Sequence, residues 1–318
     1  APGLGASRSR VRLGAGPGDY RALHRARPIE RIVHLDHYQG RRGSLGQTFA
    51  EYASVTRAFR KYIAPSVRRD DLVIVTSAPP NTVTLANAIR RRGARSIYWL
   101  QDYYPELVRG LHEYPAPARM AFRRYWDRQL LQWDRVVKIG ANLGGPTKNS
   151  VVIRNWPTLS FDRSIVPEPR TAIYSGNLGY GHDLAPLIDT CARLRRDGYR
   201  ITMRADGRGA AQLPAWLRPS PLESDPAKLR DALGRHEVHL IAANPRITQA
   251  IFPSKIWNSL AARRRLICTG FAGEMATELE VAKNAPFERH LDQWTALVDS
   301  IGNLSEPEEA LRREAGFA

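Results

Sequence analysis

The sequence predicts an α/β protein of two Rossmann-like domains, each built on a parallel sheet, from three observations. Short apolar runs alternate with longer helical patterns along most of the 318 residues. This strand–helix–strand order implies right-handed crossovers between parallel strands. A chain of this length accommodates two such domains, and a proline-containing stretch at 157–170 interrupts the alternation. We therefore expect domains at 1–156 and 157–318, with sheets facing across a cleft and the last helix able to pack back on the first domain.

The first domain is expected to follow this alternation from residue 72. An apolar run at 72–76 is typical of a buried strand, and Asn81 is placed to cap the helix that comes next. Gly93 ends that helix. The elements expected after it are strands at 96–100 and 135–140 and a helix at 116–134.

Two places in the first domain are shorter than this fold requires. Residues 1–20 hold five glycines and no opening apolar strand. Between Asn142 and Val151 there is no room for a helix, although a crossover between parallel strands takes about a dozen residues or more. We therefore expect that segments of this domain, in which a substrate loop is expected, are missing from the chain.

The second domain restarts the same alternation. Its expected elements are strands at 171–175, 201–205, 238–242 and 265–269 and helices at 184–197 and 256–262. The strand at 171–175 runs into a turn that holds Gly176, Gly179 and Gly181. Backbone N–H groups at such a turn and at the following helix receive a phosphate. The alternative is an ordinary turn whose glycines supply positive φ. The spacing does not fit the dinucleotide fingerprint.

The net charge of +17, from 48 basic and 31 acidic residues, attracts phosphates in nucleic acid, nucleotides or lipid headgroups. Only six of the basic residues are lysines, which suggests arginine-rich codon usage as much as a site. Two cysteines are too few for a disulfide framework or a thiolate zinc site. With no apolar run that could span a bilayer and no signal-peptide core, we expect a cytoplasmic protein.

One of the six lysines, Lys255, begins the second helix of this domain and is placed to meet a phosphate. Asn258 lies three residues later on the same helical face, where its amide would reach a ribose hydroxyl or a base. The alternative for both is a solvated side chain on a helix surface.

Several motifs together resemble the glycosyltransferases of the GT-B fold. The second domain carries Y-S-G-N-L-G at 174–179, F-P-S-K-I-W-N-S-L-A-A at 252–262 and T-G-F-A-G-E-M at 269–275. These resemble the donor domain of glycosyltransferase family 4, and most closely its bacterial members that build cell-envelope and exopolysaccharide sugars. The first domain adds looser similarity at 76–80 and 101–106, and the resemblance implies that this domain binds the acceptor.

The resemblance implies a retaining transferase that moves a sugar from a nucleotide-diphosphate sugar, taken as a UDP-sugar, to a glycan, polyprenyl-linked or small-molecule acceptor. It implies no metal and no further cofactor, because the helix dipole and basic side chains stabilise the leaving diphosphate. The donor-binding residues it implies are Gly176, Asn177, Leu178, Gly179, His182, Gly207, Arg208, Lys255, Asn258 and Gly273. The catalytic residues it implies are Asp102, Lys255 and Glu274.

The sequence departs from the family pattern at the donor site. Many members carry two glutamates eight positions apart, where this chain has Ala250 and Asn258. The glycine loop often carries an arginine and a lysine, where this chain has Asn177 and, nearby, His182. Histidine is a weaker and pH-dependent cation. These departures bear on the identity of the donor.

Asp102 and the stretch at 117–128 each have two possible interpretations. Asp102 either positions or deprotonates an acceptor hydroxyl, or caps the turn before Pro105. The arginine-rich stretch at 117–128 either rests on an anionic membrane, as a peripheral protein on its inner face would, or is an amphipathic helix with its apolar face in the core. The second interpretation of this stretch is favoured.

Two other function classes stay open at this stage. A sugar-nucleotide epimerase shares the architecture and needs a carboxylate acid/base pair in the cleft. A non-catalytic nucleic-acid-binding protein would use the arginines, although nucleic acid is not the expected partner.

Overall fold

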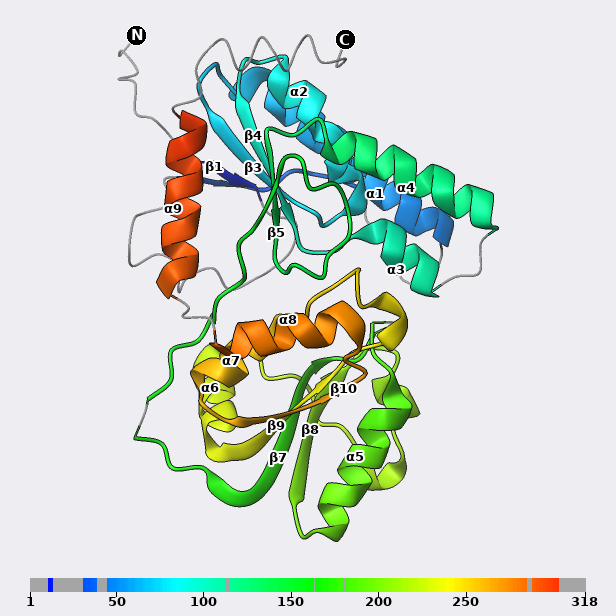
Figure 1. Ribbon diagram of the computed structural model, residues 1–318, viewed down its shortest axis with the longest axis vertical. Helices are drawn as coiled ribbons and strands as arrows, with labels where there is room; N and C mark the ends of the chain where they lie inside the picture. Colours follow the sequence, from blue (N-terminus) through cyan, green and yellow to red (C-terminus); the bar gives the residue numbers. More distant parts are fainter. Residues whose placement is uncertain are drawn as a thin grey trace. The chain divides into compact units, whose positions relative to one another are not determined.

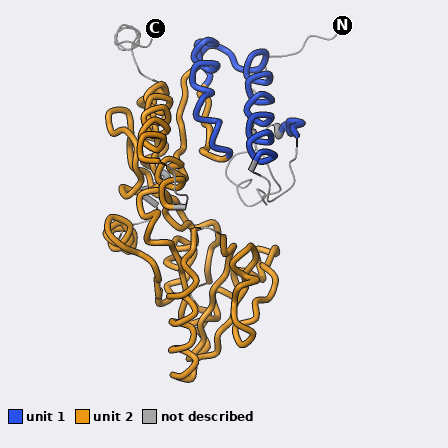
Figure 2. Tube along the Cα trace, turned by 90° about the vertical axis from the view of Figure 1, so that its right-hand side faces the viewer, with its two compact units in different colours: residues 1–71, 79–94 blue, residues 72–78, 95–318 orange. Residues whose placement is uncertain are grey.

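The computed structural model describes residues 11–13, 31–38, 45–111, 115–162, 164–179, 181–284 and 288–302 (Figure 1). Its contacts divide the chain into two compact units, one of residues 1–71 and 79–94 and one of residues 72–78 and 95–318 (Figure 2). The five glycines of residues 1–20 lie outside the described part. In the described part no helix has the length and apolar character to cross a bilayer.

In its described residues the first unit holds a two-stranded parallel sheet and three helical segments. Its elements are β1 (Val11–Leu13), β2 (Arg31–Val33), α1 (Leu45–Ser66), the 3₁₀ helix η2 (Pro80–Leu85) and α2 (Ala86–Arg90). The expectation that residues 1–20 hold no strand is wrong at the short β1. The capping prediction for Asn81 is wrong, because Pro79 is the N-cap of η2 and Pro80 its first residue. Proline suits this position, since its missing N–H would have no partner there.

The second unit begins with a four-stranded parallel sheet in the order β3-β4-β5-β6. The strands are β3 (Leu72–Thr76), β4 (Arg95–Leu100), β5 (Arg135–Lys138) and β6 (Ser150–Val152), with α3 (Tyr104–Leu111) and α4 (Ala116–Leu130) between β4 and β5. The prediction of a buried strand at 72–76 is wrong in one respect. β3 lies at the edge of this sheet, and Ile74 is 46% exposed.

The connection between β5 and β6 contains no helix, yet the two strands pair in parallel. Lys138 stabilises the fold of this connection, because its Nζ donates to the carbonyls of Leu143 at 3.3 Å and Gly145 at 3.1 Å. Gly145 takes φ +94°, which favours glycine. This compact connection brings β6 beside β5, and the expectation that a segment is missing between Asn142 and Val151 stays a prediction.

A second four-stranded parallel sheet follows, in the order β10-β9-β7-β8. Its strands are β7 (Glu168–Asn177), β8 (Arg200–Asp206), β9 (His236–Ala242) and β10 (Arg265–Thr269). The helices are α5 (Leu184–Arg196), α6 (Pro226–Arg235), α7 (Lys255–Ala261) and α8 (Gly273–Asn284), with short 3₁₀ turns η3 (Ala210–Gln212), η4 (Ala215–Leu217) and η5 (Pro245–Ile247). The predicted α/β class with two parallel, Rossmann-like sheets is confirmed.

The strand order of the second sheet creates a topological switch point. The chain leaves β7 for β8 on one side and later returns to β9 on the other side. The loops that follow β7 and β9 therefore depart in opposite directions from neighbouring strand ends. Ligands of open α/β sheets bind in the crevice that such loops leave at the carboxyl edge.

The last described helix, α9 (Glu288–Gly302), packs on the first of these sheets. Leu297 and Ile301 join a buried cluster with Ile97, Val137 and Ile153. In the same unit Arg154, just after β6, pairs with Glu278 of α8 at 2.6 Å. The boundary at residue 157 stays a prediction, because the contacts group residues 95–318 into one unit.

Candidate functional site

The switch point of the second sheet brings together two of the motifs that the sequence singled out. The glycine turn follows β7, and the segment that leads to α7 and Lys255 follows β9. Asp183, at the end of the glycine turn, donates its N–H to the carbonyl of Ala243 after β9, at 3.3 Å. The candidate site is therefore the loop pair at this edge.

The side chain of Lys255 lies directly over Gly176. A Cβ atom at Gly176 would lie 2.1 Å from Cε of Lys255 and 2.3 Å from Nζ. Gly176 also takes φ +148°, where side chains are disfavoured. The absence of a side chain at this position thus forms the slot that holds the lysine.

Tyr174 is the partner of the lysine inside this slot. Nζ of Lys255 donates to the hydroxyl of Tyr174 at 2.8 Å and lies 4.4 Å from the centre of its ring. Among the described residues Lys255 has no acidic partner. Burial lowers the pKa of Lys255 to about 8 and raises that of Tyr174. The site therefore holds a cation whose charge no carboxylate of the described residues neutralises.

His182 lies beside the lysine as a neutral ring. Burial, and then the charge of Lys255, lower the pKa of His182 to about 4. The N–H of Gly179 lies 3.1 Å from Nδ1 of His182, closer than the Gly179 carbonyl at 3.3 Å. We assign Nδ1 as the acceptor, which leaves the proton on Nε2. His182 thus offers a neutral N–H donor and adds no second full charge to that of Lys255.

The loop after β8 closes tightly on the glycine turn. Leu178 is fully buried, donates its N–H to the carbonyl of Asp206 at 2.8 Å and accepts from the N–H of Gly209 at 2.8 Å. A Cβ at Gly207 would lie 2.0 Å from Oδ1 of Asn177, and Gly207 has φ +90°. Arg208 is exposed on this loop. The structure therefore brings together four of the predicted residues, which are Asn177, Leu178, Gly207 and Arg208. The buried Leu178 stabilises the loop.

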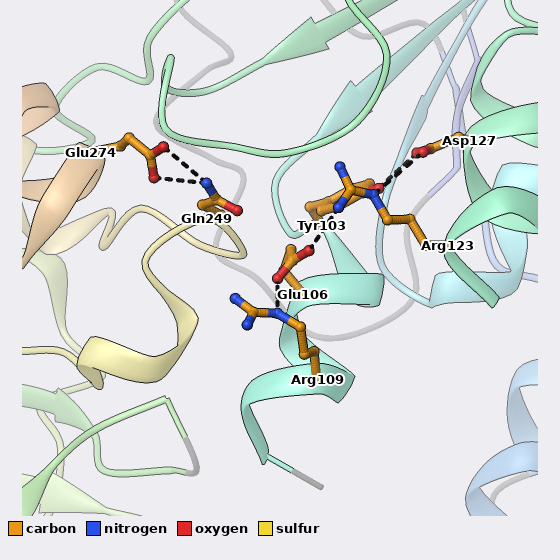
Figure 3. Close-up of polar contacts among 7 residues, drawn as sticks. All are labelled: Tyr103, Glu106, Arg109, Arg123, Asp127, Gln249 and Glu274. Atoms are coloured by element: carbon orange, nitrogen blue, oxygen red, sulfur yellow. Dashed lines mark hydrogen bonds and ion pairs between the residues drawn. The ribbon is translucent and has the colours of Figure 1, made fainter. Parts of the chain in front are cut away.

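The loop after β10 presents Gly273 and Glu274. Gly273 begins α8 with φ +53°, and no atom lies near the position of an added Cβ. The exposed Glu274 accepts hydrogen bonds from Nε2 of Gln249 at 2.9 and 2.8 Å (Figure 3). Gln249 therefore holds the Glu274 carboxylate in place, a contact that the sequence alone did not reveal.

Asn258 points to the linker between the two sheets. Its Oδ1 accepts from the N–H groups of Thr158 at 2.9 Å and Leu159 at 3.2 Å. Its Nδ2 donates to Oγ1 of Thr158 at 3.1 Å. The structure thus gives this amide a structural function, and a ribose contact for Asn258 stays a prediction.

Asp102 follows β4 at the carboxyl edge of the first sheet. Its backbone N–H donates to Oγ of the fully buried Ser77 at 3.1 Å. Within the described part its carboxylate has no hydrogen-bond partner, and burial raises the pKa of Asp102 to about 6. A carboxyl group with such a pKa accepts a proton readily near neutral pH.

A polar network holds the residue next to Asp102. The Tyr103 hydroxyl donates to Asp127 at 2.7 Å, and Arg123 contacts both Asp127 and the buried Glu106, which also pairs with Arg109 (Figure 3). Burial and the bond to Asp127 raise the pKa of Tyr103. The network joins α3 to α4 and fixes the main chain from which Asp102 projects.

The segment between β9 and α7 also bonds to the loops of the first sheet. Nδ2 of Asn142 donates to the carbonyls of Thr248 at 2.5 Å and Ile251 at 2.9 Å. The N–H of Tyr103 donates to the carbonyl of Ala250 at 2.7 Å, and that of Gly144 donates to the carbonyl of Gln249 at 2.9 Å. The loop that leads to Lys255 is therefore fastened by four hydrogen bonds.

In the described residues no cluster of His, Cys, Asp and Glu has the composition of a metal site. The described residues form a candidate anion site instead. It consists of Lys255, His182 and the backbone of the glycine turn. An anion binds such a site through charge and N–H donors.

Anion binding is expected to weaken as pH rises through about 8, because Lys255 then loses its proton. Well above this pH the loss should approach about tenfold per pH unit. Titration calorimetry with pyrophosphate at a series of pH values measures it, and Lys255→Ala corrects for the ionisation of pyrophosphate itself. A wild-type profile that parallels the variant at every pH would exclude Lys255 as the cation.

No family model matches the chain, and no curated protein matches it significantly in sequence. Solved structures that resemble it include an α,α-trehalose-phosphate synthase (UDP-forming) from Burkholderia xenovorans, at 13% identity over 84% of this chain and 78% of that chain, with a TM-score of 0.45. A UDP-glucosyltransferase from Polygonum tinctorium has 12% identity over 80% and 71%, with a TM-score of 0.43. The calicheamicin glycosyltransferase CalG4 has 13% identity over 89% and 80%, with a TM-score of 0.37.

Proposed function

We propose that this chain is a GT-B glycosyltransferase that transfers a sugar from a nucleotide-diphosphate sugar with retention of configuration. The observation that carries the proposal is the Lys255 ammonium, held over Gly176 at the switch point of a parallel sheet with no acidic partner in the part of the chain that the structure describes. A leaving diphosphate needs this kind of fixed positive charge. The motifs at 174–179, 252–262 and 269–275 support the same class by resemblance.

In this proposal each loop at the edge of the second sheet contacts one part of the donor. Lys255, the N–H donors of the glycine turn and Nε2 of His182 bind the diphosphate. Gly207 and Arg208 lie beside the base or ribose, and Gly273 and Glu274 border the sugar. Gln249 orients the Glu274 carboxylate toward the sugar hydroxyls.

Asp102 is proposed to act on the acceptor. Its carboxylate has no partner among the described residues, and its pKa of about 6 suits a group that accepts a proton from a hydroxyl. Ser77 and Tyr103 hold the main chain on either side of its side chain. A glycan or a polyprenyl-linked sugar is the proposed acceptor, in polysaccharide or cell-envelope synthesis.

The proposal is tested with a panel of UDP- and GDP-sugars, by release of free nucleotide and by thermal protection. A glycosyltransferase is expected to be stabilised by its own donor and to release its nucleotide slowly to water. Interconversion of the donor sugar without nucleotide release would identify an epimerase instead. Tight, salt-dependent DNA binding without protection by any nucleotide sugar would identify a nucleic-acid-binding protein.

We further propose that the outer face of α4 contacts an anionic membrane. The apolar face of this helix is in the core, since Trp126 and Leu130 are buried. On the rest of the helix Met120 and Tyr125 are 53% and 49% exposed. Three of its arginines, unlike Arg123, have no side-chain partner among the described residues: Arg119, Arg124 and Arg128. Arginines that flank exposed apolar side chains suit an anionic lipid surface.

Charge reversal on this face, Arg124→Glu with Arg128→Glu, is expected to weaken binding to phosphatidylglycerol vesicles at least about tenfold, since each arginine contributes about 1 kcal/mol. Co-sedimentation measures it, with phosphatidylcholine vesicles for comparison. The control is Arg193→Glu with Arg196→Glu, which reverses the same charge on the exposed surface of α5. Equal loss in both variants would indicate a response to net charge and not to α4.

A further inference from the structure

We infer that Tyr174 is a positioning residue that holds the Lys255 ammonium in place for the diphosphate. The inference rests on the proposed function and adds to it Tyr174, to which the proposed function gives no role. Tyr174 is fully buried in β7, so its ring has a fixed position under the site. Its hydroxyl reaches the carboxyl edge of the sheet, where Lys255 meets it at 2.8 Å.

The hydroxyl of Tyr174 has its own hydrogen-bond direction fixed. It donates to the backbone carbonyl of Asn177 at 3.3 Å, so its oxygen is left to accept from Lys255. The Lys255 ammonium thus donates to the Tyr174 hydroxyl, which in turn donates to the Asn177 carbonyl at the end of β7. The phenol stays protonated, because burial raises the pKa of Tyr174.

The remaining surroundings leave the ammonium available for an anion. Nζ has three N–H donors, and in the described part Tyr174 is its only hydrogen-bond acceptor. Gly176 closes the slot from below, and the titratable groups that face the ammonium are Tyr174 on β7 and His182 before α5. Two donors of this held cation therefore have no acceptor among the described residues, and less ordering is needed when the diphosphate binds.

Tyr174→Phe removes the hydroxyl and keeps the rest of the side chain. The ring still fills the core, but the ammonium loses its acceptor. Because the hydroxyl stabilises the charged form of the lysine, its removal should lower the pKa of Lys255 below about 8. We expect UDP or GDP, whichever the wild type binds, to bind about 10- to 100-fold more weakly, the range for a lost hydrogen bond to a charged group.

NMR of protein with ¹³C-labelled lysine measures the pKa without any ligand. Only six lysines contribute signals, and Lys255→Met identifies the signal of Lys255. Calorimetry with UDP and GDP measures affinity on the same samples. Tyr98→Phe, which alters a buried tyrosine of the other sheet beside Trp133, controls for general loss of stability.

Gly176→Ala is the second variant, and it keeps the inference testable if Tyr174→Phe does not fold. Its new Cβ must displace Lys255 from Tyr174 toward solvent. Affinity should again fall, but the pKa of Lys255 should now rise toward its ordinary value because burial is relieved. A general loss of structure would not produce opposite pKa changes in the two variants.

The outcomes separate this inference from the proposed function. A lower lysine pKa with weaker nucleotide binding in Tyr174→Phe supports the role of Tyr174. Unchanged affinity or an unchanged lysine pKa in that variant overturns it, while the wild type still binds nucleotide. If the wild type itself binds neither UDP nor GDP, the proposed function fails, and the positioning of a diphosphate fails with it.

Discussion

Lys255→Ala is expected to lower the turnover of the donor sugar by about 10²–10³-fold while the fold stays intact. The variant removes the one cation that lies in the Gly176 slot among the described residues, and with it the charge that is proposed to stabilise the leaving diphosphate. The fold should tolerate the change, because the half-buried ammonium contributes one hydrogen bond to a neutral partner and burial itself disfavours its charge. Release of UDP or GDP from the matched donor measures the effect.

Lys228→Ala is the matched control for this experiment. Lys228 also lies in the first turn of a helix that follows a loop, but it is exposed on α6. Its removal changes the net charge equally and should leave turnover unchanged. Turnover that is equal in Lys255→Ala and in the control would remove Lys255 from the site.

Arg154→Met is expected to lower the free energy of unfolding by about 3–5 kcal/mol, the range for breaking a buried ion pair. The side chain of Glu278 is 2% exposed, and Arg154 bonds it through Nε at 2.6 Å and Nη2 at 3.1 Å. Without the guanidinium the carboxylate is buried and unpaired. Urea denaturation followed by circular dichroism measures the loss.

Two comparisons define the origin of that loss. Arg200→Met breaks an exposed pair with Glu168 and should cost about 1 kcal/mol or less. Arg154→Met combined with Glu278→Leu removes both charges, so much of the lost stability should return. If Arg154→Met costs no more than Arg200→Met, the pair does not anchor α8 to the segment after β6.

Local sequence patterns predicted most elements of the second unit, because a buried parallel strand has a clear apolar signature. The strands β8 and β10 lie close to their predicted ranges, and both are flanked by turn residues. The edge strand β3 was the exception. Its apolar run looks the same whether one face or both are covered, so the sequence did not reveal that Ile74 would be exposed.

The candidate site was predictable where its chemistry follows a short motif. Gly176 and Lys255 each belong to such a motif, and the structure brings them into contact. The function of Tyr174 was not predictable, since an aromatic residue in a buried strand suggests core packing and nothing else. The partner of Asn258 was equally hidden, because its contact with Thr158 spans 100 residues of sequence.

The four hydrogen bonds that fasten the loop before α7 have a consequence for how the two sheets influence each other. Residues 248–251 accept these hydrogen bonds from Asn142, Tyr103 and Gly144. Lys255 follows only four positions later in the chain. Lys255 is thus held from two sides, by the Tyr174 hydroxyl and by the loops of the first sheet. Under the proposed function, a substitution at Asn142 is therefore expected to act allosterically, because it would shift Lys255 through the backbone without touching the donor.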